Sequence, residues 1–152
     1  MISFEPITKE TLYIAFELVN SNAAYNQLET GQETRSNDEV GSEYMQKNTN
    51  SLFIKADDTY IGLINYMKEN PKDGYPWLGS FMIHSAYHGF GYGTQAYVVF
   101  EQYLTEQGIS RLRLGVLQQN ARARAFWERL GFSFYATKPL VNNVVDCFEK
   151  EF

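Results

Sequence analysis

The stretch Tyr87-His88-Gly89-Phe90-Gly91-Tyr92-Gly93-Thr94, here called the glycine turn, carries three glycines at alternate positions. It lies between an apolar run, residues 77–83, and a segment with helical spacing, residues 95–104. This order predicts a strand, a tight turn and a helix. Such a turn leaves backbone N–H groups unpaired and lets a ligand approach them, because glycine has no Cβ. The helix start adds roughly half a positive charge, so the stretch predicts a backbone anion site.

The composition of the chain fits one soluble globular domain. Its 152 residues are 44% hydrophobic and 20% charged, and 16% are aromatic, which predicts a ring-rich core. The net charge is −5 and no basic run occurs, so we expect no nucleic-acid partner, because phosphate neutralisation supplies most of that affinity. The acidic balance mildly favours a cationic substrate.

The single cysteine, Cys147, excludes an intrachain disulfide and a zinc site built from several cysteines. We expect it to be structural, and we expect no metal. The first residues lack a charged segment followed by an apolar one, and no apolar run approaches the ~20 residues of a membrane span. These features predict a cytoplasmic protein without a membrane partner. A monomer or homodimer is expected.

The periodicity of apolar residues predicts a mixed α/β (α+β) fold in a single domain, residues 1–152. The order of elements is not that of an alternating doubly wound fold, because three consecutive strands precede the glycine turn. A helix capped by Thr8 is expected to end near residues 20–22, Asp38 to cap a short second helix, and residues 26–37 to form a loop or broken helix. The expected strands are residues 2–6, 51–56, 59–67, 77–83, 112–117, 132–137 and 141–148, and the later helices are residues 95–104 and 120–130.

Two familiar phosphate motifs fail in the glycine turn. A dinucleotide fingerprint needs Gly-x-Gly-x-x-Gly; Gly89 and Gly91 fit, but Thr94 stands at the third glycine, and no acidic residue follows at a strand end. A P-loop needs Gly-Lys-Ser/Thr, and no glycine of the turn precedes a lysine. A flexible connection without a ligand is disfavoured, because a mere connection rarely needs alternate glycines at a helix start.

The glycine turn has a companion motif further along the chain. The first motif is His88-Gly89-Phe90-Gly91-Tyr92-Gly93, and the second is Asn120 followed by Trp127-Glu128-Arg129-Leu130-Gly131-Phe132. Together they resemble the GNAT superfamily of acetyl-CoA-dependent N-acyltransferases, whose motifs are Gln/Arg-x-x-Gly-x-Gly/Ala and an Asn before a helix ending in an aromatic, Glu, Lys/Arg, Leu, Gly and Phe. Both occur in the family's order and at this separation, and the predicted element order extends the resemblance to nearly the whole chain.

This resemblance implies a GNAT-like domain with acetyl-CoA as cosubstrate, built on a central, mostly antiparallel sheet of six to seven strands and about four helices. Backbone N–H groups of residues 89–94 would hold the pyrophosphate, with His88 giving a weaker, pH-dependent contact in place of Gln or Arg. The strand at residues 81–83 would splay from the next strand and offer its backbone to the pantetheine arm. The implied cofactor-binding residues are Phe81, Met82, Ile83, His88, Gly89, Phe90, Gly91, Tyr92, Gly93, Thr94, Asn120, Ala123 and Trp127.

Acetyl transfer to an amine needs a neutral nitrogen and a polarised carbonyl. A main-chain N–H near Ile83 is expected to polarise the carbonyl. Relatives often carry a general-base Glu on the strand before the turn, and this chain has none between residues 77 and 83. Glu69 and Tyr75, with Asp73, are therefore the candidates just upstream, acting directly or through water; His84 is expected at the surface or in packing.

The leaving thiolate is usually protonated by a Tyr at the position that Trp127 occupies here. Indole is no useful acid, but a thiol pKa near ~8.5 makes the thiolate a tolerable leaving group. Water, Tyr92 or Tyr135 are alternative proton donors, and Trp127 either packs in the core or lines the cofactor tunnel. Arg122 and Arg124 are either solvated or near the 3′-phosphate. Three tyrosines form an acceptor pocket or simply core: Tyr25, Tyr44 and Tyr66.

The leading hypothesis is an N-acetyltransferase that moves an acetyl group from acetyl-CoA to a primary amine of a small molecule, peptide or protein, by direct attack in a ternary complex. The missing Glu and Tyr motivate a second hypothesis, a non-catalytic acyl-CoA-binding or sensing module. A dinucleotide-dependent enzyme is a third, disfavoured by Thr94.

Overall fold

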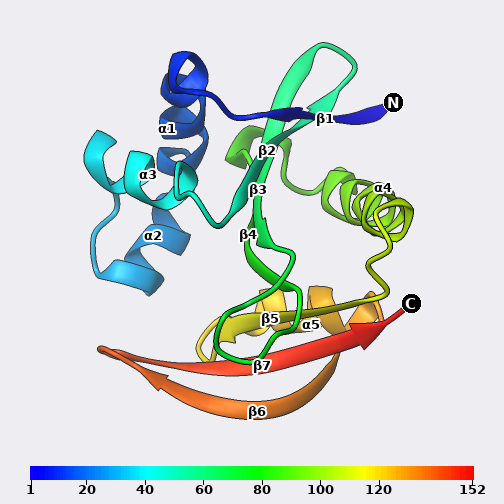
Figure 1. The fold of residues 1–152 in the computed structure, drawn as a ribbon. Helices are drawn as coiled ribbons and strands as arrows, with labels where there is room; N and C mark the ends of the chain where they lie inside the picture. Colours follow the sequence, from blue (N-terminus) through cyan, green and yellow to red (C-terminus); the bar gives the residue numbers. More distant parts are fainter.

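Seven strands form one sheet in the order β1-β2-β3-β4-β5-β7-β6 (Figure 1), in a computed structural model that describes residues 1–152. Only the β4–β5 pair is parallel. The elements are β1 (Ile2–Pro6), α1 (Leu12–Asn20), α2 (Ala23–Thr30), α3 (Asn37–Tyr44), β2 (Asn50–Ala56), β3 (Thr59–Met67), β4 (Trp77–Ile83), α4 (Tyr92–Glu106), β5 (Arg111–Leu117), α5 (Ala121–Arg129), β6 (Ser133–Leu140) and β7 (Asn143–Glu151). The mixed, mostly antiparallel class is confirmed, with five helices where about four were expected.

Two hydrophobic cores lie on the two sides of the sheet, with α1, α2 and α3 on one side and α4 on the other (Figure 1). The larger core joins α4 to the sheet and centres on Phe100, which is fully buried and packs edge-to-face against Phe4 and Tyr66. The smaller core joins α1 and α3 to β2 and β3. None of the helices combines the length and the apolar character that crossing a bilayer requires.

Helix α2 corrects the expectation that residues 26–37 form a loop or broken helix. The helix runs to Thr30 and ends at Gly31, whose φ of 78° is the left-handed conformation that glycine adopts easily at a helix end. Its only buried residue is Asn26, whose Nδ2 donates to the carbonyls of Val19 and Glu33, each at 3.0 Å. A helix held by a buried polar side chain has no apolar stripe, so periodicity could not reveal it.

Helix α3 begins two residues earlier than the expected cap at Asp38 would place it. Its N-cap is Ser36, whose Oγ accepts from the Glu39 N–H at 3.2 Å, while the Glu39 carboxylate accepts from the Ser36 N–H at 3.1 Å. This reciprocal capping box satisfies two donors, which a cap at Asp38 would leave open.

The sheet is split between β4 and β5. The two strands pair only at Trp77–Arg113 and Leu78–Leu114, and they diverge beyond these residues. Although β4 is the middle strand of seven, only Leu78 in it is buried. The expected splaying of residues 81–83 is therefore confirmed, and it opens the centre of the sheet.

A bulge in β4 changes the direction of the side chains that follow it. Leu78 lies opposite Tyr66 and Ser80 opposite Asn65, so Gly79 has no partner residue in β3. Because alternation resumes after the extra residue, Ser80 faces the same side as α3, and its hydroxyl contacts that of Tyr44. A Cβ at position 79 would lie 3.0 Å from the Asn65 side chain, which explains why glycine stands there.

Candidate functional site

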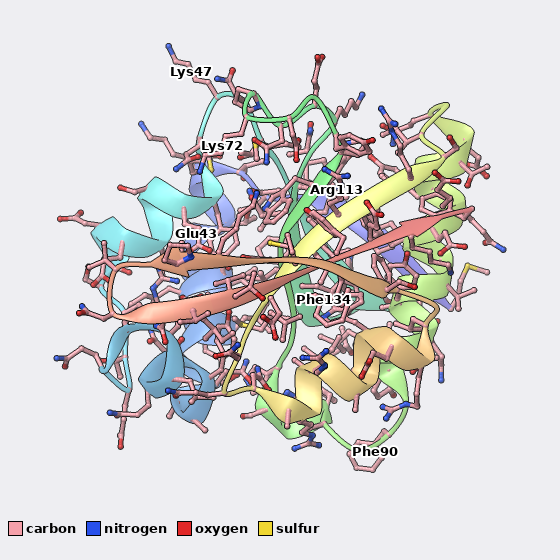
Figure 2. The ribbon with its side chains drawn as sticks, turned by 90° about the horizontal axis from the view of Figure 1, so that it is seen from below. Glu43, Lys47, Lys72, Phe90, Arg113 and Phe134 are labelled. Carbon is pink, nitrogen blue, oxygen red and sulfur yellow. The ribbon has the colours of Figure 1, made fainter.

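A cavity of about 730 Å³ occupies the split between β4 and β5. It extends from the glycine turn and the start of α5, along β4, to α2 and α3. The structure brings together twelve of the thirteen predicted cofactor-binding residues along its walls: Phe81, Met82, Ile83, His88, Gly89, Gly91, Tyr92, Gly93, Thr94, Asn120, Ala123 and Trp127. The exception is the side chain of Phe90, which is 69% exposed and projects from the molecule (Figure 2).

The glycine turn presents a row of unpaired donors to this cavity. Gly89 and Gly91 have φ of 84° and 81°, and α4 starts at Tyr92. The first backbone bond of the helix runs from the Gln95 N–H to the Gly91 carbonyl, at 3.2 Å. The six backbone N–H groups before it, residues 89–94, donate to no acceptor in the chain. Six successive free donors at a helix start are suited to a phosphate-bearing ligand.

Gly93 allows α5 to approach the start of α4. A Cβ at this position would lie 3.2 Å from the Phe126 ring and 3.9 Å from Ile83. Position 93 is helical, so the reason for glycine is close packing and not backbone conformation. The glycines of the turn therefore serve two needs: Gly89 and Gly91 shape the row of donors, and Gly93 holds it beside α5.

His88 ties the glycine turn back to the end of β4. Its Nε2 lies 2.7 Å from the Ile83 carbonyl, which can only accept, so Nε2 carries the proton. The Asn22 Nδ2 donates to the same carbonyl at 3.1 Å. His88 therefore has only Nδ1 left for the ligand contact that the sequence predicts.

His84 is held by two structural bonds, in agreement with its expected place outside the chemistry. Its Nδ1 accepts from the Ala86 N–H at 3.0 Å, so Nε2 is the donor to the Glu17 carboxylate, 2.7 Å away. The bond to Glu17 joins α1 to the end of β4.

Strand β4 offers backbone donors to the split. The His84 N–H donates to the Ile61 carbonyl at 2.8 Å, and bonded pairs alternate along an antiparallel ladder. The N–H groups of Ile83 and Phe81 therefore point away from β3, toward the side on which β5 has diverged. Both lie on the wall of the cavity.

Asn120 and Trp127 join α5 to this cavity. The Asn120 Oδ1 caps the helix by accepting from the Ala123 N–H at 3.1 Å, and Nδ2 makes no hydrogen bond within the chain. Trp127 is 7% exposed and packs edge-to-face with Phe81 and Tyr97, at 5.5 Å between ring centroids in each case. Trp127 thus packs in the core and lines the cavity at once.

The two arginines of α5 that the sequence singled out have different environments. Arg124 donates to Asp146 at 2.9 Å, and Asp146 is 4% exposed, so this arginine compensates a buried carboxylate. Arg122 and Arg129 both line the cavity, and neither has a carboxylate partner. Positive charge therefore gathers at the α5 end of the cavity. Of the alternative acids, Tyr92 lines the cavity, whereas Tyr135 does not.

Glu69, Asp73 and Tyr75 are not brought to the cavity. They lie in the loop before β4, whereas the glycine turn follows it, and a strand of seven residues spans about 20 Å. The Tyr75 ring lies under the Arg113 guanidinium at 3.5 Å, and Asp73 pairs with the same arginine at 3.2 Å (Arg113 is labelled in Figure 2). The geometry of the loop therefore does not support the predicted role of Glu69 and Tyr75 as bases.

A connected set of polar side chains forms the opposite end of the cavity from α5, and sequence reasoning missed most of it. The Arg35 Nη1 lies 2.6 Å from the Glu43 carboxylate and 3.4 Å from that of Glu29. Glu29 accepts from the Tyr25 hydroxyl at 2.8 Å, and Glu43 accepts from Ser80 at 3.0 Å. We call the connected residues the polar wall; they are Tyr25, Glu29, Arg35, Glu43, Tyr44 and Ser80.

The two tyrosines of the polar wall are fixed as hydrogen-bond donors. Burial and then the charge of Glu29 raise the pKa of Tyr25, and burial and then the charge of Glu43 raise the pKa of Tyr44, both well above the ordinary range. Their hydroxyls therefore keep their protons at neutral pH. Tyr66, the third tyrosine predicted for this region, is 2% exposed and belongs to the core.

Cys147 is 1% exposed and lies outside the cavity. Burial raises the pKa of its thiol, which keeps it protonated and unreactive. The structural role expected for this cysteine is confirmed.

The family model for the acetyltransferase (GNAT) family matches residues 16–132. These residues include most of α1, all of α2 to α5, the glycine turn and both sequence motifs. Comparison with curated protein sequences gives no match.

Solved structures share this fold over nearly the whole chain. An acetyltransferase from Thermus thermophilus has a TM-score of 0.86 at 18% identity, covering 100% of this chain and 97% of its own. The ribosomal-protein-S18-alanine N-acetyltransferase from Escherichia coli has a TM-score of 0.74 at 15% identity, and the match covers 99% of this chain and 94% of that one. The PaiA N-acetyltransferase from Thermoplasma acidophilum, in complex with coenzyme A, has a TM-score of 0.71 at 17% identity. The match covers 100% of this chain and 99% of that one. At these identities the likeness establishes the fold.

Proposed function

The chain belongs to the acetyltransferase (GNAT) family, and we propose that residues 1–152 form an N-acetyltransferase that moves the acetyl group of acetyl-CoA to a primary amine. Solved relatives bind coenzyme A or acetyl coenzyme A. The observation that carries the proposal is the row of six unpaired N–H groups, residues 89–94, at one end of a cavity that reaches the polar wall. The acceptor is a small-molecule, peptide or protein amine, and the expected compartment is the cytoplasm.

The residues of the cavity fit acetyl-CoA along its length. The free donors of residues 89–94 would hold the pyrophosphate, and Arg122 and Arg129 would compensate further phosphate charge. Asn120 Nδ2 would donate to the pantetheine arm, with Ala123 and Trp127 as apolar walls. Met82 lines the cavity on the opposite side of β4 from these walls.

When bound, acetyl-CoA supplies an activated thioester carbonyl, and β4 would polarise it. A pantetheine arm whose pyrophosphate is held at the glycine turn would reach the Ile83 N–H first and the Phe81 N–H further along the split. We therefore propose that Ile83 binds the arm and that Phe81 stands closer to the carbonyl than the Ile83 donor predicted from sequence. Removing one such donor from an oxyanion site costs about 3–4 kcal/mol of transition-state stabilisation.

One continuous cavity runs from the glycine turn to the polar wall, which supports direct attack in a ternary complex. The cofactor would occupy the end at the glycine turn and α5, and the amine the end at the polar wall. The leaving thiolate needs no strong acid, because a thiol pKa near ~8.5 makes it a moderate leaving group, and Tyr92 on the cavity wall is a candidate donor.

Asn120 offers a test that separates binding from helix capping. Asn120→Ser keeps a capping oxygen but removes the free Nδ2, so stability should change by less than about 0.5 kcal/mol while acetyl-CoA binds roughly 2- to 13-fold more weakly. Asn120→Ala loses both functions and should also lose about 1 kcal/mol of stability. Thermal denaturation and calorimetric titration with acetyl-CoA measure the two effects. Equal affinity in Asn120→Ser and the unmodified protein would remove Asn120 from the site.

The proposed function itself is tested by binding followed by turnover. Acetyl-CoA at about 100 times its Kd should stabilise the protein by roughly 2.7 kcal/mol, seen as a rise in Tm. Thiol release should then be measured with 1,5-diaminopentane, Nα-acetyl-lysine amide and Ala-Phe amide. We expect the Tm to rise and at least one amine to be acetylated; no rise in Tm at millimolar acetyl-CoA would refute the cofactor site.

A non-catalytic acyl-CoA-binding module is the second candidate function. Two observations favour it: β4 carries no carboxylate, and tryptophan stands at position 127. A rise in Tm with acetyl-CoA, without acetylation of any amine over a wide panel, would select the module over the enzyme.

A further inference from the structure

We propose that Glu43 takes the proton of the acceptor amine through the hydroxyl of Ser80. This inference rests on the proposed function and assigns the general base that β4 lacks. The juxtaposition that carries it is a carboxylate of α3 bonded, at 3.0 Å, to the one hydroxyl that β4 places on the cavity wall.

The position of Ser80 follows from the bulge at Gly79. Ser80 is the residue before Phe81, whose N–H faces the split. Without the extra residue in β4, the side chain at position 80 would point toward the α4 side of the sheet. The bulge therefore brings a hydroxyl to the point where the polar wall meets the open backbone donors of β4.

The hydrogen bonds around Ser80 run in one direction. Tyr44 keeps its proton and donates to the Ser80 Oγ at 3.2 Å. The Ser80 Oγ–H in turn donates to the Glu43 Oε1 at 3.0 Å. Ser80 retains a second lone pair, because a hydroxyl oxygen has two. An amine N–H in the cavity can donate to that lone pair.

The relay balances as a proton transfer. As the nitrogen bonds to the thioester carbonyl carbon, its N–H becomes acidic; that N–H bond breaks and a new O–H bond forms on Ser80. The original Ser80 O–H bond breaks, and its proton forms an O–H bond with Glu43 Oε1. In the net change the nitrogen loses one proton and becomes the amide nitrogen, the C–S bond breaks with its electron pair leaving on the coenzyme A thiolate, and Glu43 changes from carboxylate to carboxylic acid; no further reactant is needed.

Glu43 is better placed for this role than Glu29. Glu29 accepts from Tyr25, one turn away on its own helix, and makes no bond to β4. Glu43 is the one carboxylate that reaches β4, and its other oxygen is fixed by Arg35 at 2.6 Å (Glu43 is labelled in Figure 2). The ionisable side chains that face Glu43 across the wall and its outer side are Arg35, Glu29, Glu39, Asp38, Tyr25 and Tyr44.

The test is Glu43→Gln, which keeps the size of the side chain and a hydrogen-bonding oxygen but cannot take a proton. With whichever of the three amines named above is the best substrate, kcat should fall about 100-fold or more, while the KM for acetyl-CoA stays unchanged. The pH profile should change as well: the acid limb that the ionisation of Glu43 gives the unmodified protein should disappear in the variant, which leaves only the dependence on free amine that both proteins share. A purely structural role would not produce this change of profile.

Three further variants keep the test decisive. Ser80→Ala should lower kcat in the same direction, and Ser80→Thr, which keeps a hydroxyl, should recover much of the loss. If Glu43→Gln shows no rise in Tm with acetyl-CoA, it is judged not to fold. The comparison of Ser80→Ala with Ser80→Thr then decides the test alone. Glu33→Gln is the matched control, because Glu33 is exposed, makes no ion pair and lies outside the cavity; its kcat should equal that of the unmodified protein.

The outcomes separate the inference from the proposed function. A Glu43→Gln enzyme with kcat within about threefold of the unmodified protein and the same pH profile would overturn the relay and leave the acetyltransferase intact. If the unmodified protein binds acetyl-CoA but acetylates no amine, the proposed enzyme fails and the relay falls with it.

Discussion

Gly91→Glu is expected to abolish acetyl-CoA binding. Gly91 is the N-cap of α4 with φ of 81°, and it lies inside the row of free N–H groups, residues 89–94. A glutamate there adds a negative charge where the pyrophosphate would bind, and strains the backbone by roughly 1–2 kcal/mol. The expected result is no rise in Tm at millimolar acetyl-CoA, where the unmodified protein gains roughly 2.7 kcal/mol at 100 times Kd.

Gly108→Glu is a matched control at the other end of α4. Gly108 also has φ of 81°, and a Cβ there would meet nothing within 4 Å. This variant should suffer a similar backbone strain of about 1–2 kcal/mol and still bind acetyl-CoA with unchanged affinity. Equal affinity in Gly91→Glu and Gly108→Glu would show that the anion site lies elsewhere.

Phe100→Ala is expected to destabilise the fold by about 3–5 kcal/mol, because it removes a fully buried ring and leaves a cavity. The ring lies where α4 meets β1 and β3, against Phe4, Tyr66 and Tyr103. Urea denaturation measures the change in the free energy of unfolding. The loss is large compared with the total stability of a typical domain, about 5–15 kcal/mol, so partial unfolding near 37 °C is expected.

Phe90→Ala is the control for the same chemical change at an exposed site. The Phe90 ring is 69% exposed, so its removal should alter the free energy of unfolding by less than about 0.5 kcal/mol. A loss for Phe90→Ala as large as for Phe100→Ala would mean that the turn packs against something this fold does not show.

The sequence predicts the sheet well where local signals bound each strand. Residues 77–83 form β4 as expected, because Pro76 precedes the run and the glycine turn follows it. Residues 59–67 form β3 for a similar reason, after the turn at Asp57 and Asp58. The apolar periodicity did not predict helix α2, because Asn26, a polar residue, supplies its only buried side chain. Only tertiary packing shows that the Nδ2 of this amide donates to two carbonyls from other segments.

The part of the cavity proposed for the cofactor could be assembled from the sequence because its geometry is local. Backbone donors at the glycine turn depend on a few consecutive residues, and Asn120 marks the start of α5. Apart from Tyr25 and Tyr44, the polar wall could not be predicted, because its members come from α2, α3, β4 and the loop between the helices. Each of its charged residues looks solvated in the sequence. Glu69 was assigned by proximity along the chain, although β4 carries the chain about 20 Å away from it.

The split between β4 and β5 gives this sheet two more edges than its outer strands provide. β1 and β6 are the outer edges, and the halves of β4 and β5 beyond Leu78 and Leu114 face each other unpaired inside the sheet. Open strand edges invite pairing with any extended chain, including an unfolded segment of another molecule. A pantetheine arm, with amide groups at suitable spacing, would act as a substitute strand there. Bound coenzyme would then protect the protein against aggregation as well as supply the acetyl group.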